Sequence, residues 1–388
     1  MKILFDFISL QDKFINGGAE YTLKVLTKLI DNKQCELIGL LDKKKVIPNF
    51  LSEIINLYTI KCFYIQDSLE QIVLEQKIDK FYIGIAQRYN SFDLTKLSCK
   101  ILITCHDVGD LCNEYDNKID SVRLRFVQKY TKNSLTKSIK QYLSLVYHFF
   151  KPYKVGKFYK NFEKLVKQEN VYVITDSEYS KASISYFFDD IYNNVEVFYA
   201  PHKQVNNIAN CNVQNELLKG IIYSKKKYFL LLNCERYNKN AALFAEIWNY
   251  FCKKNHNNYY AIMIGKLNYT EKNIIQIDSL SVTDLEFAYK NAYALVYPSV
   301  SEGFGYPPIE AMKYGTPVLC SNVTSIPEVC GNKVLYFSPY YPEDLFMAMT
   351  KICQNRDLYS KLALEQYSWI SKKQEQDFTK LIKYIIEI

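Results

Sequence analysis

The most informative stretch of this sequence runs from residue 298 to 310 and holds two glutamates, Glu302 and Glu310, on either side of two glycines. A strand is predicted to end where the stretch begins, and a helix to begin at its prolines, because proline is favoured in the first helical turn. Gly303 and Gly305 allow close backbone approach to a ligand, and a helix N-terminus offers N–H groups to a phosphate. Carboxylates at such a loop accept hydrogen bonds from vicinal hydroxyls, as on a ribose or a hexose.

Neither glutamate identifies this chemistry when taken alone. Glu310 also fits the third position of a capped helix, and Glu302 also fits a solvated loop carboxylate. Other standard sites are absent, namely a Walker loop, G-x-G-x-x-G, H-E-x-x-H and G-x-S-x-G. The sequence has no D-x-D motif to hold a metal on a sugar-nucleotide diphosphate, and its four histidines do not suggest a histidine-rich metal site.

Residues 302–331 resemble the family-4 retaining glycosyltransferases of the GT-B fold, whose signature is two glutamates with seven residues between them in this glycine and proline setting. Further segments resemble the same family in the same order. They are a first glycine-rich loop at 17–20, a T-x-H-D segment at 104–107, an S-x-x-S helix start at 176–180, an R-x-x-K-N segment at 236–240 and a late F-S-W segment at 367–369.

The resemblance implies a role for each matching side chain. Glu302 is expected to bind the hydroxyls of the transferred sugar and His106 to line the sugar site, and these two are the catalytic candidates. Glu310 is expected to bind the ribose hydroxyls of the nucleotide. Arg236 and Lys239 are expected to neutralise the leaving diphosphate.

The resemblance also implies close backbone approach at two loops. Gly303, Phe304 and Gly305 are expected to lie against the sugar and phosphates of the donor, and Gly17 and Gly18 against the phosphates and the acceptor. Cations and a helix N-terminus then neutralise the diphosphate. No metal and no other cofactor is therefore expected.

The implied reaction moves a hexosyl group, with a mannosyl group as the first candidate, from a GDP- or UDP-linked sugar to a glycan or lipid-linked acceptor in surface polysaccharide synthesis. The configuration of the anomeric carbon is retained. Two alternatives remain open: a non-catalytic GT-B protein that binds sugar or stabilises a partner, and another GT-B enzyme such as a sugar-nucleotide epimerase or a disaccharide phosphorylase. The intact set of charged candidates argues against the first, because a chain freed from catalysis has no chemical reason to keep it.

Alternating strands and helices around these segments predict an α/β fold. Predicted strands lie at 2–9, 35–41, 100–105, 171–175, 195–199, 228–232, 259–264, 294–297 and 317–320, and predicted helices at 19–30, 179–188, 241–251, 283–291, 308–314, 342–353 and from 358 to the end. A polar stretch at 204–214 predicts a linker.

The GT-B resemblance implies two Rossmann-like α/β domains that face each other across a cleft, with a C-terminal helix that crosses back to the first domain. We assign 1–205 to an acceptor-binding domain, 206–370 to a nucleotide-sugar-binding domain, and 371–388 to the helix that packs back on the acceptor-binding domain.

The net charge of +8 comes from one segment, residues 121–168, which carries 12 Lys and Arg against the single acid Glu163 and also holds ten aromatic residues. Such a segment could bind nucleic acid, could dock on an anionic membrane, or could be a solvated helical face in a chain with 34 tyrosines. Its place in the predicted acceptor domain favours an anionic membrane surface or acceptor. No nucleic-acid-binding module is recognisable, so no nucleic-acid partner is expected.

The composition is that of a globular protein, with 48% hydrophobic residues and only 12 Gly and 10 Pro among 388 residues. No apolar run reaches the roughly 18 residues that a membrane span requires. Asp6 interrupts the first apolar run where a signal peptide would continue, and the eleven cysteines form no C-x-x-C pair. We therefore expect a cytoplasmic protein, or one that is peripheral on the inner face of the membrane.

Overall fold

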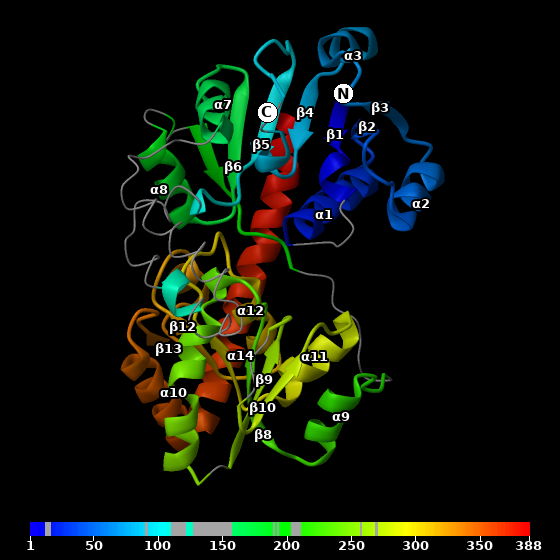
Figure 1. The fold of residues 1–388 in the computed structure, drawn as a ribbon. Coiled ribbons are helices and arrows are strands. Elements are labelled where there is room, and N and C mark those ends of the chain that lie inside the picture. The colour runs from blue at the N-terminus through cyan, green and yellow to red at the C-terminus, as the bar shows by residue number, and fades with distance from the viewer. Residues whose placement is uncertain are drawn as a thin grey trace, which may run out of the picture. The chain divides into compact units, whose positions relative to one another are not determined.

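The computed structural model describes residues 1–11, 17–89, 92–109, 122–126, 157–188, 191, 194–202, 211–256, 258–267 and 271–388 (Figure 1). They form two compact units, the first built from Met1–Val108, Lys154–Lys203 and Lys372–Ile388, and the second from Gly109–Tyr153 and Gln204–Ser371. Each unit contains one parallel sheet. The predicted α/β class with two Rossmann-like sheets is confirmed.

The sheet of the first unit has, within the described ranges, seven parallel strands in the order β3-β2-β1-β4-β5-β6-β7. Its strands are β1 (Lys2–Asp6), β2 (Glu36–Leu41), β3 (Lys61–Tyr64), β4 (Lys80–Ile83), β5 (Lys100–Thr104), β6 (Val171–Thr175) and β7 (Val195–Val197). Phe5 of β1 lies opposite Gly39 and Tyr82. Because every pair is parallel, the strands end at the same edge of the sheet.

Helices pack against this sheet through apolar residues spaced three and four apart. They are α1 (Gly17–Asn32), α2 (Asn49–Leu57), α3 (Leu69–Gln76), α7 (Lys157–Val166) and α8 (Glu178–Phe187), with short 3-10 helices η1 (Ile8–Leu10) and η2 (Ala86–Tyr89). In α1, for example, Val25, Leu26 and Leu29 are buried. The predicted strand 2–9 is therefore too long, because Asp6 accepts the Ser9 N–H at 3.0 Å and the chain turns there into η1.

The sheet of the second unit has the order β10-β9-β8-β11-β12-β13, again parallel throughout the part that the structure describes. Its strands are β8 (Lys227–Leu231), β9 (Tyr259–Ile264), β10 (Ile274–Ile277), β11 (Ala294–Tyr297), β12 (Val318–Ser321) and β13 (Leu335–Phe337). Its helices are α9 (Glu216–Tyr223), η5 (Tyr237–Lys239), α10 (Ala241–Lys254), α11 (Val282–Asn291), α12 (Tyr306–Met312), α13 (Ile326–Cys330) and α14 (Pro342–Glu387).

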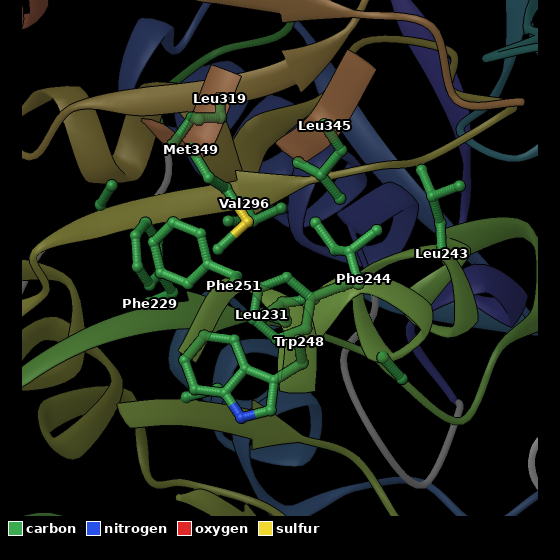
Figure 2. Packing of buried hydrophobic residues seen from close by; sticks show 14 of the residues in the cluster. Phe229, Leu231, Leu243, Phe244, Trp248, Phe251, Val296, Leu319, Leu345 and Met349 are labelled. Atoms are coloured by element: carbon green, nitrogen blue, oxygen red, sulfur yellow. The ribbon is translucent and has the colours of Figure 1, made fainter. Parts of the chain in front are cut away.

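Alternating residues of β8 supply two separate cores, one on each face of this sheet. Phe229 packs with Trp248 and Phe251 of α10 (Figure 2), and the ring centroids of Phe229 and Phe251 lie 5.5 Å apart. Tyr228 and Leu230 belong to the opposite core, with residues of α9, α11 and α12. Burial on both faces is what a parallel sheet requires.

Helix α14 belongs to both units. Its backbone is non-helical at Asn355, between the two helices that the sequence predicted at 342–353 and from 358 onward. Residues up to Ser371 belong to the second unit and Lys372–Ile388 to the first, so the predicted C-terminal helix does join the first unit. None of the helices in the described part of the chain is long and apolar enough to cross a membrane.

Most of the basic segment 121–168 lies outside the described residues. Residues 122–126 form a short helical stretch that groups with the second unit, where Arg125 pairs with Glu246 at 2.9 Å and Val122 packs on Val300. Residues 157–168 contain α7, in the first unit.

Candidate active site

The loop between β11 and α12 is held in place by Ser325, at the start of α13. The Ser325 hydroxyl donates to the carbonyl oxygens of Glu302 and Phe304, at 3.0 and 3.2 Å. Gly305 precedes α12 with a φ of 97°, a backbone conformation that strains any residue with a Cβ atom. Two prolines occupy the first turn of α12, where their missing N–H groups need no partner. The loop is therefore rigid, and it presents Glu302.

Glu302 forms an ion pair with Lys239, the last residue of η5. The Lys239 ammonium also lies 3.4 Å from the Tyr297 hydroxyl and 5.4 Å from the centroid of its ring. Only 9% of the Lys239 side chain and 13% of the Glu302 side chain are exposed, so the pair is largely removed from water. Burial and the nearby Glu302 carboxylate raise the pKa of Tyr297 well above 10, so its phenol is neutral.

Glu310 lies on α12 and accepts a hydrogen bond from the Tyr289 hydroxyl of α11. Burial, with the Glu310 carboxylate next in importance, raises the pKa of Tyr289 well above 10. Each of the two glutamates of the sequence motif thus meets a buried, neutral tyrosine. In both cases the tyrosine holds one side of the carboxylate in place, and the carboxylate can still accept hydrogen bonds from a ligand.

Adjacent strands bring these side chains together. β8 and β11 pair in the sheet, and the chain segments that follow them pair as well, because the Asn238 carbonyl accepts the Val300 N–H at 2.9 Å. In the second unit the structure therefore gathers Lys239 with the loop of Glu302, Gly303, Phe304 and Gly305, and Glu310 follows in α12.

Arg236 lies on the same segment, directly before η5, and is exposed. Its guanidinium forms no ion pair with any residue that the structure describes. It is therefore positioned beside Lys239 in the chain but is not part of the buried pair.

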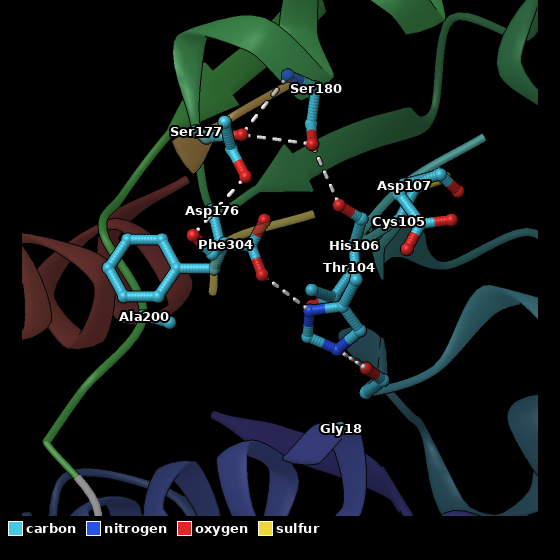
Figure 3. A network of polar contacts seen from close by, with 12 residues as sticks. Gly18, Thr104, Cys105, His106, Asp107, Asp176, Ser177, Ser180, Ala200 and Phe304 are labelled. Carbon is cyan, nitrogen blue, oxygen red and sulfur yellow. Dashed lines mark hydrogen bonds and ion pairs between the residues drawn. The ribbon is translucent and has the colours of Figure 1, made fainter. Parts of the chain in front are cut away.

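In the first unit, His106 follows β5 and both of its ring nitrogens face oxygen atoms (Figure 3). Nδ1 lies 2.9 Å from the Asp176 carboxylate and Nε2 lies 3.2 Å from the Gly84 carbonyl. Tyr21 of α1 contacts the ring edge-on, with centroids 4.9 Å apart. Burial would lower the pKa of His106, but Asp176, Asp107 and the Gly84 carbonyl outweigh it and raise the pKa above 6.5.

The backbone around His106 is also held by side chains. The Ser180 hydroxyl, in the first turn of α8, donates to the His106 carbonyl at 2.9 Å, and Ser177 caps the same helix by accepting the Ser180 N–H at 3.1 Å. The S-x-x-S helix start therefore holds the backbone of the loop that contains His106 (Figure 3).

Gly17 and Gly18 form the first turn of α1. A Cβ atom at Gly18 would lie 3.0 Å from the Ile85 side chain and 3.4 Å from His106 Nε2, so only glycine fits there easily. The structure therefore brings Gly18 beside His106. Gly17 is exposed at the helix start.

Asp6 closes the first unit's polar network at the end of β1. Its buried carboxylate accepts the Ser9 N–H, the Gly84 N–H at 3.1 Å and the Tyr89 hydroxyl at 2.7 Å. Burial raises the pKa of Asp6, against the effect of these hydrogen bonds. Gly84 is thereby held through both of its backbone polar groups, its N–H by Asp6 and its carbonyl by His106.

Four partners of the predicted residues did not emerge from the sequence as site residues: Tyr289, Tyr297, Gly84 and Asp176. Asp176 stood within a recognised segment, directly after a predicted strand, and that position was the available signal. No group of three or more His, Cys, Asp or Glu within the described ranges could hold a metal ion. The ten cysteines of those ranges are free thiols.

The family match lies in the second unit. Residues 214–369 match the family described as Glycosyl transferases group 1. The O-antigen chain mannosyltransferase RfbU of Salmonella typhimurium is 33% identical over 147 residues, 35% of this chain and 41% of that protein. The O-antigen chain mannosyltransferase B of Escherichia coli is 55% identical over 56 residues, 14% of this chain and 15% of that protein. The matches thus span less than half of either relative.

Solved structures match the whole chain at low identity. A glycosyltransferase from Rickettsia africae aligns with a TM-score of 0.66 and 14% identity, over 100% of this chain and 98% of that one. HepE of Anabaena, solved with UDP and glucose, aligns with a TM-score of 0.65 and 12% identity over the full length of both chains. At these identities the likeness shows the fold alone, and that fold is GT-B, as the sequence predicted.

Proposed function

We propose that the chain, whose residues 214–369 match the glycosyl transferases group 1 family, transfers a hexosyl group, with retention, from a nucleotide-diphosphate sugar to a glycan or lipid-linked acceptor. The observation that carries this proposal is the arrangement of Glu302 with Lys239, and of Glu310 with Tyr289, after the adjacent strands β8 and β11. Ligands of open α/β sheets bind at this carboxyl edge.

In the proposed reaction, Glu302 binds the hydroxyls of the transferred sugar and Glu310 binds the ribose hydroxyls. Negative charge develops on the leaving diphosphate as the bond to the anomeric carbon breaks. Lys239 and Arg236 offset that negative charge, and the positive end of the α12 dipole offsets it further. The ion pair with Glu302 holds the Lys239 ammonium in a site largely removed from water, where its charge acts most strongly.

Partial relatives and solved structures support the proposed donor and acceptor. Two of them are named O-antigen chain mannosyltransferases, which supports mannose as the sugar and a surface polysaccharide as the product. HepE was solved with UDP, which supports a nucleoside diphosphate donor, GDP- or UDP-linked. We assign the donor to the second unit and the acceptor to the first, where Gly17, Gly18 and His106 lie.

Residues 121–168 are proposed to hold the protein against an anionic membrane surface or an anionic acceptor. The described part of this segment supports the idea, because Lys160 and Lys164 of α7 are exposed. Lipid-linked acceptors are presented at a headgroup layer, where cations gain binding energy.

The first experiment identifies the donor. Thermal unfolding is measured with GDP-mannose, UDP-glucose and UDP-galactose, and the donor is expected to raise Tm because it binds only the folded chain. Nucleotide release is then measured with and without a panel of oligosaccharide acceptors. Release that depends on the acceptor supports transfer and excludes a sugar-nucleotide epimerase.

The second experiment tests the two glutamates. Glu302→Gln and Glu310→Gln are each expected to lower kcat/KM about a hundredfold, because each removes a charged acceptor for a sugar hydroxyl. Glu216→Gln is the control, since Glu216 is an exposed carboxylate of α9. Wild-type rates in both glutamate variants would overturn the proposed function.

A further inference from the structure

Both nitrogens of the His106 ring are occupied by protein acceptors. The Gly84 carbonyl, 3.2 Å from Nε2, can only accept a hydrogen bond, so Nε2 must carry a hydrogen. The Asp176 carboxylate, 2.9 Å from Nδ1, accepts as well when it is ionised, and Nδ1 then carries the second hydrogen. A ring with two N–H groups is an imidazolium and has no lone pair.

We propose that Asp176 is a positioning residue that holds His106 as a fixed imidazolium, so that His106 supplies positive charge to the site and does not accept a proton from the acceptor substrate. The role in transfer rests on the proposed function. The ionisation state does not, because only contacts within the first unit support it.

The acceptors of the ring cannot easily turn away. The Gly84 N–H donates to Asp6 at 3.1 Å, which fixes the peptide directly before the one whose carbonyl faces Nε2. Asp176 directly follows β6, is 3% exposed, and has no lysine or arginine partner among the described residues. Its other oxygen, Oδ1, is buried without a hydrogen-bond partner in that part of the chain. His106 is thus the cation that balances this carboxylate.

The titratable groups around the ring agree with this assignment. Asp107 is next to His106 in the chain and adds a second negative charge, and Tyr21 of α1 contacts the ring edge-on. Asp6 lies on the far side of the Gly84 peptide. The 18% of the His106 side chain that is exposed offers a ligand only carbon-bound hydrogens and the charge of the ring.

The structure suggests a variant that changes charge and keeps shape. In Asp176→Asn the amide can donate to Nδ1, so a neutral ring with its hydrogen on Nε2 keeps both contacts. Nitrogen-15 NMR of histidine-labelled protein then reports the ring directly. The chain has four histidines, and the His106 signal is assigned by its loss in His106→Asn.

At pH 7.5 the wild-type His106 ring is expected to show two protonated nitrogens, and the Asp176→Asn ring only one. Asp107→Asn is the matched control, because it removes a nearby negative charge without touching the bond to Nδ1. It should leave the ring doubly protonated. A neutral ring in the wild type, with the proton on Asp176, overturns the proposal, and this measurement stands even if Asp176→Asn does not fold.

The activity measurement separates this proposal from the proposed function. The charge of His106 is present below its folded pKa and is lost as the pH rises through it, so the wild-type rate should persist to higher pH than that of Asp176→Asn. At pH 8 the variant should be about a hundredfold slower, and it should recover toward the wild-type rate at low pH. Identical pH profiles would overturn the positioning role. If no nucleotide sugar is turned over at all, the proposed function fails while the NMR result still decides the state of His106.

Discussion

Gly84 is the residue on which the first unit's polar network depends. Its N–H donates to Asp6 and its carbonyl faces His106, so one residue joins the ends of β1, β4 and β5. A Cβ atom at this position would lie 2.1 Å from the Thr22 hydroxyl and 2.5 Å from its methyl group. No side chain fits in that space without moving α1.

Gly84→Ala is therefore expected to lower the free energy of unfolding by about 2–4 kcal/mol, since the methyl group must displace Thr22. Urea unfolding measures the change. Gly220→Ala is the matched control, because no atom lies within 4 Å of a Cβ there. That change is within α9 and should stabilise the protein by about 0.5–1 kcal/mol. Equal effects of the two substitutions would contradict the packing argument.

Residue identity predicted which side chains carry chemistry but not which groups they touch. Glu302 and Glu310 stood out by their spacing, and Lys239 by a short motif. Tyr289 and Asp176 did not, because a tyrosine in a helix or an acid after a strand is ordinary until the sheet order is known. The contact of Asp176 with His106 exists because β5 and β6 are neighbours, across 70 positions of sequence.

At the scale of elements, lysines at the beginnings of strands hold the C-terminal end of α14. Lys80 of β4 is 5% exposed, and its ammonium donates to the carbonyls of Ile385 and Ile386, at 2.9 and 2.7 Å. The last carbonyls of a helix have no partner within it, and cations are favoured at that end. Burial lowers the pKa of Lys80. The lysine thus joins the helix end to the sheet.

Lys80→Met keeps most of the side-chain volume but leaves these carbonyls without their donor. The free energy of unfolding of the first unit should fall by about 1–3 kcal/mol. Amide hydrogen exchange in Lys372–Ile388 should become faster. Lys61→Met, at an exposed lysine of β3, should change stability by less than about 0.5 kcal/mol. Unchanged exchange in Lys80→Met would contradict the role of this lysine.

Some strongly apolar elements were predictable, and several short strands were not. The helix at 241–251 and the strand at 259–264 appear close to their predicted bounds. The sequence did not indicate β3, β4, β10 or β13, which are three or four residues long and too short to show a period. Three of them, β3, β10 and β13, are at the sheet edges, where partial burial weakens the apolar signal, whereas β4 is central and buried.

At the scale of the whole molecule, charge is distributed unevenly along the chain. The segment 121–168 alone exceeds the net charge of +8. Its described lysines on α7, Lys160 and Lys164, are exposed. The excess positive charge lies in one segment, so substitutions there can reduce it without changing Glu302 or His106.

Vesicles of phosphatidylglycerol are expected to bind the protein at low salt and to release it at high salt, because screening weakens attraction between exposed charges. Lys160→Glu with Lys164→Glu should weaken binding in a cosedimentation assay. Lys225→Glu with Lys226→Glu makes the same charge change at exposed lysines of the second unit, and it should weaken binding less. Equal binding to neutral phosphatidylcholine vesicles would refute membrane docking.

The passage of α14 from one unit to the other sets an order of assembly during synthesis. The ribosome completes Gln204–Ser371 before it releases Lys372–Ile388, which the first unit needs. At roughly 5–20 residues per second, about ten to forty seconds separate residue 203 from residue 388. During that interval the Lys80 ammonium lacks the carbonyls of α14 to which it donates in the folded chain. The Ala200 carbonyl likewise lacks its donor, the side-chain amide of Gln374. The unit that begins first on the ribosome is therefore the last to close.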